Sequence, residues 1–199
     1  MLTKIFTPTL LLFACLFGNV AYATPSIQHW QSASGAKVLF VENHDIPMLD
    51  VAVSVPAGSS ADSATKSGVA ALTHHLLDLG SQGLSEDETA RGLADLGAQL
   101  GGGFDQDRAS ISLRTLSRAA VREQALFIMA KVLQHPLYTP EILAREKARV
   151  VDGLKEAATK PENIADRAFQ KAVYGTHPYA LPVSGDVATV EGVTVQDLQ

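Results

Sequence analysis

Residues 68–81, GVAALTHHLLDLGS, constrain the fold of this chain more than any other stretch. Ser67 is placed to cap a helix at the start of this stretch, and Gly80 is placed to end it. The large apolar side chains recur at helical spacing and predict a helix with one buried stripe, formed by Val69, Leu72, Leu76 and Leu79. Any fold for this chain must therefore bury one side of this helix.

The other side of the predicted helix gathers His74, His75 and Asp78, which suggests a metal site. Two zinc-binding imidazoles on one helix normally stand four residues apart, whereas these two histidines are neighbours that point about 100° apart. The inverted zinc motif H-x-x-E-H, laid over residues 71–75, keeps one ligand, His75. Ala71 replaces the first histidine, and His74 replaces the glutamate that acts as general base.

The N-terminus has the pattern of a secretory signal peptide over residues 1–23. Lys4 gives a positive start, residues 10–18 form an uncharged apolar core, and residues 21–23 form a small-x-small cleavage site. The apolar core is too short to span a membrane. We expect export to the periplasm or secretion, with residues 24–199 forming the mature domain.

A rival interpretation makes the chain a lipoprotein that is processed at Cys15. The bulky Phe13 does not suit a lipoprotein processing box, so we favour cleavage after Ala23. That cleavage removes the only cysteine, and the mature chain would then have no disulfide, thiolate ligand or cysteine nucleophile. Any metal would need histidine or carboxylate ligands.

Charge and length narrow the class of protein further. The net charge is −5, and its basic side chains are scattered without a stripe, which disfavours nucleic-acid binding. The length suffices for one hydrophobic core. The chain stops soon after a capping-box-like helix start at residues 194–197, so we expect it to be a truncated piece.

Hydrophobic periodicity and turn residues predict an α+β fold, with an antiparallel-rich sheet and helices packed on one face. The glycine triplet 101–103 lacks the lysine and following helix of a phosphate loop, and it fits a strand that allows close backbone approach. The predicted strands are 27–32, 37–42, 49–56, 98–104 and 109–116, and the further helices are 85–97, 118–134, 140–158 and 163–174.

Short segments along the chain match a known family pattern in their order and spacing. They are residues 34–38 (SGAKV), the strand 51–58, the loop 57–62, and residues 68–70, 80–81, 96–98 and 169–185. Together they resemble the pitrilysin/insulinase family of zinc metallopeptidases, which includes mitochondrial processing peptidase. The resemblance covers nearly all of residues 27–199 and implies the fold of one half of such a protein, a LuxS/processing-peptidase-like half.

The resemblance also implies where the zinc residues should stand. Peptide-cleaving members bind zinc through both motif histidines and a glutamate on a later helix, while the motif glutamate polarises the bound water. Carried over, the later glutamate falls near Gly153. Asp152 and Glu156 lie close to it, but neither restores the ligand missing at Ala71. His75 is thus the only ligand position that survives.

The family includes subunits that keep the fold but have lost the zinc residues. This chain resembles them, and we expect a non-catalytic homologue without zinc that pairs with an active sibling subunit around a peptide-degrading or processing chamber. Two alternatives stay open. One is an active metalloendopeptidase with displaced zinc ligands, His74, His75 and Asp78. The other is a peptide-binding scaffold without a protease partner, which would receive peptides by strand addition.

Overall fold

The computed structural model describes residues 26–199, so the predicted signal peptide and Cys15 lie outside the described residues. The chain divides into two units, Met1–Ile46 and Pro47–Gln199. In the first unit, β1 (Ile27–Gln31) pairs antiparallel with β2 (Lys37–Val41). This confirms the strand pair that the sequence predicts around the turn at Gly35.

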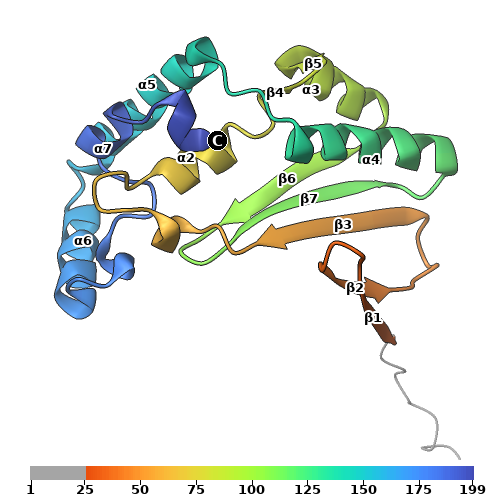
Figure 1. Ribbon diagram of the computed structural model, residues 1–199, viewed down its shortest axis with the longest axis horizontal. Helices are drawn as coiled ribbons and strands as arrows, with labels where there is room; N and C mark the ends of the chain where they lie inside the picture. The colour runs from red at the N-terminus through yellow and green to blue at the C-terminus, as the bar shows by residue number, and fades with distance from the viewer. Residues whose placement is uncertain (1–25) are drawn as a thin grey trace, which may run out of the picture. The chain divides into compact units, whose positions relative to one another are not determined.

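The second unit is built on a three-stranded antiparallel sheet in the order β3-β7-β6 (Figure 1). Its strands are β3 (Met48–Val55), β6 (Gln99–Phe104) and β7 (Ala109–Leu116). β7 alternates between buried and exposed side chains, with Ile111 and Leu113 buried on one face. This alternation is typical of an antiparallel sheet that is covered on one side. Among the described residues, the strand order makes β3 and β6 the two edge strands of this sheet.

Helices cover the buried face of this sheet (Figure 1). α4 (Ala119–Gln134) packs Ala125 and Met129 against the apolar side chains of β7. A second core joins α2 (Val69–His75) to α5 (Pro140–Ala157), and it contains Leu72, Leu76 and Leu143. The predicted α+β class, with helices on one face of an antiparallel sheet, is therefore confirmed.

The remaining elements are shorter or lie at the periphery. Ser85 and Glu88 form a capping box at the start of α3 (Glu86–Asp95), which confirms the helix predicted over residues 85–97. α6 (Pro161–Tyr174) begins two residues before the predicted start, because proline suits the first turn of a helix. The sequence patterns missed several short elements: β4 (Gly80–Ser81), β5 (Leu84–Ser85), α7 (Val187–Glu191), and the 3-10 helices η1 (Ser59–Ala61) and η2 (Pro178–Ala180). The helix start expected at residues 194–197 is confirmed, because Thr194 and Asp197 form the capping box of the 3-10 helix η3 (Val195–Leu198).

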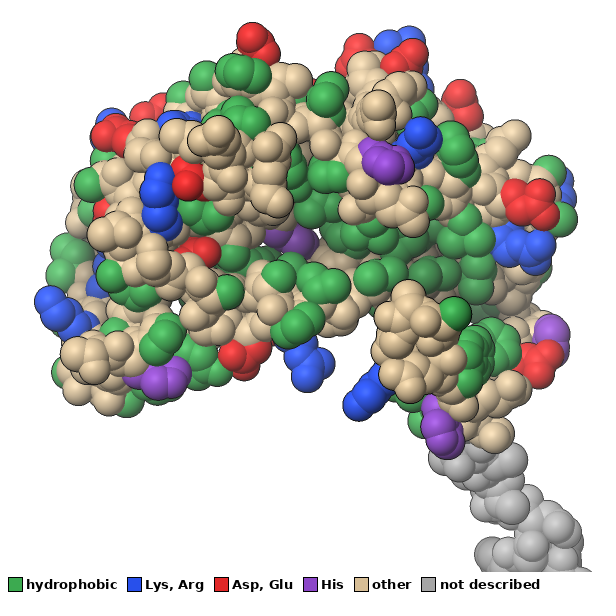
Figure 2. All heavy atoms as spheres, viewed as in Figure 1, with side chains coloured by type: hydrophobic (Ala, Val, Ile, Leu, Met, Phe, Trp, Pro, Cys, Tyr) green, Lys and Arg blue, Asp and Glu red, His purple; other side chains and the backbone are tan. Residues whose placement is uncertain are grey.

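Two surface properties bear on function. Within residues 26–199, none of the helices has the length and apolar character needed to cross a bilayer. On the face drawn in Figure 2, acidic and basic side chains are interspersed rather than gathered into a stripe of one sign.

The glycine triplet lies in β6, as predicted, and Gly102 is the member that requires glycine. A Cβ at this position would collide with the backbone oxygen of Ser110 and would lie 2.9 Å from Nε2 of His74. At Gly101 the nearest atom to an added Cβ is Oγ of Ser112, 3.9 Å away, which is an ordinary contact. The close approach of β6, β7 and α2 therefore depends on Gly102.

We expect Gly102→Ala to lower the free energy of unfolding by about 1–3 kcal/mol, because the added methyl group overpacks the sheet. Gly101→Ala is the matched control, and its effect should stay within about 0.5 kcal/mol. Urea denaturation of both variants measures the difference. Equal losses in the two variants would contradict the close-approach argument.

Candidate functional site

The helix that carries the motif, α2, is shorter than the sequence predicts. Its N-cap is Gly68, not Ser67, and Gly68 has a left-handed backbone with a φ of 97°. The hydroxyl of Ser67 instead donates a hydrogen bond to the backbone oxygen of Pro182 (3.1 Å). The carboxylate of Asp62 accepts from the backbone N–H groups of Gly68 (2.8 Å) and Ala70 (3.1 Å), and so takes over the capping role.

The end of α2 also differs from the prediction. The helix ends at His75 with Leu76 as its C-cap, rather than at Gly80. Asp78 therefore lies in a turn after the helix, so the helical i, i+4 pairing of His74 with Asp78 is not formed. The apolar pattern continues beyond the end of the helix, because Leu79 packs against the same core from outside it. The sequence therefore predicts a helix that is too long.

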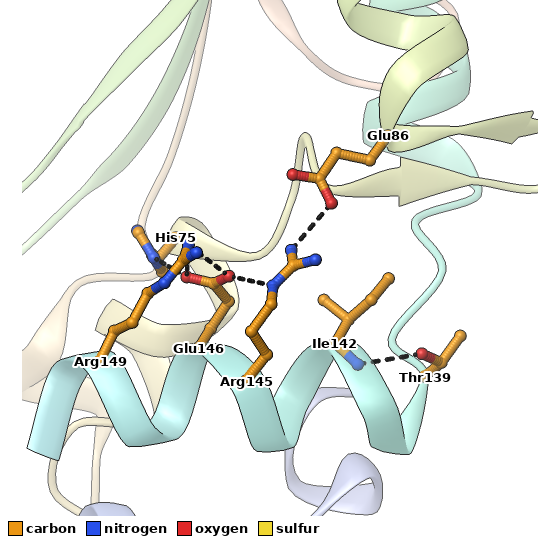
Figure 3. Close-up of polar contacts among 7 residues, drawn as sticks. All are labelled: His75, Glu86, Thr139, Ile142, Arg145, Glu146 and Arg149. Carbon is orange, nitrogen blue, oxygen red and sulfur yellow. Dashed lines mark hydrogen bonds and ion pairs between the residues drawn. The ribbon is translucent and has the colours of Figure 1, made fainter.

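His75, the surviving ligand position, contacts an acidic residue that sequence reasoning missed. Its Nε2 lies 3.2 Å from Oε2 of Glu146 on α5, whose side chain is only 2% exposed. Two guanidinium groups donate to the same carboxylate: Nε of Arg145 at 2.6 Å, and Nη1 of Arg149 at 3.0 and 3.3 Å from its two oxygens. Figure 3 shows all three side chains converging on Glu146.

A second carboxylate extends this group to α3. Nη2 of Arg145 donates to Oε2 of Glu86 at 2.8 Å, at the start of that helix (Figure 3). We call His75, Glu86, Arg145, Glu146 and Arg149 the Glu146 cluster. It links α2, α3 and α5 through side chains alone.

The charges in the cluster fix the protonation of Glu146. Burial raises the pKa of this carboxyl. Hydrogen bonds from Arg145 and His75 and the charges of both arginines lower the pKa by more than burial raises it, so the pKa of Glu146 lies below its ordinary value. Hydrogen bonds to Glu86 and then Glu146 raise the pKa of Arg145. An ionised carboxylate only accepts hydrogen bonds, so Nε2 of His75 is the donor and carries a proton.

A sequence signal for Glu146 does exist. The buried residues of α5 are Leu143, Glu146, Val151 and Leu154, so an acidic residue stands on the stripe that faces the core. It is flanked by Arg145, and Arg149 follows one turn later. An acidic residue on a buried stripe with arginines beside it indicates a buried ion pair. The family resemblance places the later glutamate near Gly153 and therefore gives no role to Glu146.

His74, which occupies the general-base position, points to the sheet. Its Nε2 donates to the backbone oxygen of Ser110 on β7 at 3.0 Å. Its ring lies 5.8 Å from that of Phe104 on β6, measured between centroids. The imidazole thus fastens α2 to the sheet above Gly102.

Between α2 and the edge strand β6 lies a small cleft of about 190 Å³. It is lined by His74, His75, Asp78, Leu100, Gly101, Gly102 and Ile111. The cleft brings the predicted histidines and Asp78 to one place. It lies beside an edge strand, where an extended peptide has access to backbone hydrogen-bonding groups.

The residues present do not fit a zinc ion. Ala71 offers a methyl group, and Gly153 has no side chain, with open space where its Cβ would stand. Nε2 of His75 is engaged by Glu146. Over residues 26–199, no three histidine, cysteine or acidic side chains come together in a group able to hold a metal ion, and that includes His74, His75 and Asp78.

Fold and site together define a metallopeptidase-type domain in which the zinc ligands are missing. Residues 37–187 match the model of the family described as Insulinase (Peptidase family M16). The chain belongs to this family.

Solved structures of known proteins resemble the chain in sequence or in fold. A solved structure described as the peptidase M16 inactive domain from Pseudomonas fluorescens is 39% identical, with a TM-score of 0.84 over 87% of this chain and 42% of that one. Pitrilysin is 22% identical, with a TM-score of 0.72 over 89% of this chain and 19% of its own, which shows the shared fold.

Curated relatives are more distant in sequence. An uncharacterized zinc protease of Bacillus subtilis, YmxG, is 21% identical over 164 residues, which are 82% of this chain and 40% of that protein. One from Rickettsia felis is 23% identical over 163 residues, which are 78% of this chain and 38% of that protein. The chain therefore spans about two fifths of the length of these relatives.

We expect Glu146→Gln to lower the free energy of unfolding at pH 7 by about 1–2 kcal/mol, because it weakens the charged hydrogen bonds that Arg145 and Arg149 make with this side chain. The pKa of Glu146 is lowered on folding, so its contribution is present above the ordinary value of 4.5 and is lost as the pH falls below it. The gap between wild type and variant should narrow in acid. Denaturant unfolding at a series of pH values measures it, and a gap independent of pH would contradict the assignment.

Proposed function

We propose that this chain is part of a non-catalytic homologue of a zinc metallopeptidase, which pairs with an active sibling subunit of the same family. Together the two would enclose a chamber in which peptides are degraded or processed. The observation that carries this proposal is the occupation of the motif by Ala71, His74 and Gly153, with His75 committed to Glu146. The 39% identity to a domain described as inactive supports it.

Export belongs to the same proposal. Residues 1–23 would direct the protein to the periplasm or outside the cell, with cleavage after Ala23. Residues 24–199 would then be the N-terminal domain of the mature protein. The active sibling would have to be exported too, because the two subunits must meet.

The structure explains how such a chain keeps its fold without the chemistry. Its cores are formed by apolar side chains, among them Leu72, Leu76 and Leu143 at the junction of α2 and α5. Those contacts do not involve the lost ligand positions. A homologue with these cores retains a surface for a partner and for peptides, whereas the bond-breaking step falls to the sibling.

The test is recovery of the partner, followed by an assay of the pair. Tagged protein, isolated from the source organism, should bring down a sibling with an intact H-x-x-E-H motif. The chain alone should not cleave peptides, and the pair should. Replacing the motif glutamate of the sibling with glutamine should abolish cleavage, because that residue activates the water. The matched change in this chain, His74→Gln, should leave cleavage in place, because glutamine keeps a donor for the backbone oxygen of Ser110.

The opposite pattern would favour the active alternative, in which His74, His75 and Asp78 supply displaced ligands. In that case the isolated chain cleaves peptides and loses activity in the His74→Gln variant. This result would overturn the proposed function.

The open edge of β6 gives the peptide-binding scaffold a specific observation in its favour. β6 pairs only with β7 in the described sheet, so its other side is free to receive an extended peptide. The same isolation experiment separates this alternative from the first. Peptide binding without recovery of any sibling would favour the scaffold.

A further inference from the structure

Within the Glu146 cluster, the carboxylate of Glu146 is surrounded by cationic hydrogen-bond donors. One carboxylate with a 2% exposed side chain receives hydrogen bonds from two guanidinium groups and one imidazole. An ionised carboxylate buried without partners is strongly destabilising. Arg145 and Arg149 therefore supply the positive charge that balances the buried carboxylate of Glu146, as a bound cation does at other buried acidic sites.

The cluster also coincides with the family's metal position. His75 is the surviving ligand position, and Gly153 stands where the later glutamate would be. Glu146, Arg149 and Gly153 follow each other at i, i+3 and i+7, so they share one face of α5. Figure 3 shows the Arg149 guanidinium beside Glu146 and His75.

We propose that Arg145 and Arg149 replace the metal ion electrostatically, so that α2 and α5 are joined without a metal and a divalent cation is repelled from His75. The two arginines divide this work. Arg145 has a half-exposed side chain and is also held by Glu86, so it mainly stabilises the junction. Arg149 is 69% exposed and is therefore the more solvent-accessible of the two arginines, so its charge mainly opposes a cation that approaches from solvent.

The first test compares thermal unfolding with and without a metal chelator. We expect the melting temperature of the full chain to be the same in EDTA and in added zinc, and elemental analysis to find no bound zinc. Arg149→Met should lower the melting temperature, because it removes a partner of the buried carboxylate. Arg91→Met is the matched control, since Arg91 is 74% exposed and pairs only with Asp87 on the surface of α3.

Three results of this test would overturn the proposal. They are a melting temperature that falls in EDTA, one equivalent of zinc that is lost on His75→Ala, and equal melting temperatures for the Arg149→Met and Arg91→Met variants.

The second test restores the missing ligands and asks whether Arg149 opposes zinc. The background is Ala71→His, His74→Glu and Gly153→Glu together, checked for folding by circular dichroism and titrated with zinc alone in a calorimeter. Adding Arg149→Met should raise the zinc affinity at least tenfold, because a neighbouring positive charge is removed. Adding Arg91→Met should not change it. Equal affinities in the two backgrounds would refute the role of Arg149.

Should the restored background fail to fold, the single variants of the first test still decide the matter. The inference does not depend on a partner. A chain that recovers no sibling, yet melts independently of chelator, would refute the proposed function and leave this inference standing.

Discussion

The junction between α2 and α5 buries one charge, the carboxylate of Glu146, beside the apolar contacts of Leu72 and Leu76 with Leu143. A buried carboxylate must be matched by positive charge, and here it is matched by Arg145, Arg149 and the imidazole N–H. Arg145 also donates a hydrogen bond to Glu86 on α3, which connects that helix to the same group of side chains. The consecutive helices α2 and α3 are thereby linked to α5, which follows much later in the chain, and Nε2 of His75 is engaged by Glu146.

The retained fold and the lost chemistry have separate physical causes. The fold rests on apolar contacts such as Leu72 and Leu76 with Leu143, and on the close approach of α2 to the sheet at Gly102. Zinc peptidase chemistry needs three protein ligands and a general base in one place, and Ala71 offers no ligand atom at the first of the positions that the motif assigns. A family of metallopeptidases can therefore contain members that fold in the same way and have no zinc site.

Most of the fold follows from local patterns. The strands and long helices were predicted within a few residues, because alternation and helical periodicity act over short stretches of chain. The errors fall where the pattern is ambiguous. The apolar stripe runs on through Leu76 and Leu79, but the helix ends at His75. The two-residue strands β4 and β5 are too short to show any period.

The sequence alone predicts which ligand positions lack a ligand, because Ala71 and His74 stand in a motif of fixed spacing and the family resemblance places the later glutamate near Gly153. It also determined the family, through the order of short segments. Only the tertiary structure decided what His75 does instead. Its partner, Glu146, lies 71 positions away on another helix, and no local pattern fixes how two such helices pack. Contacts of that kind arise from the packing of the whole core.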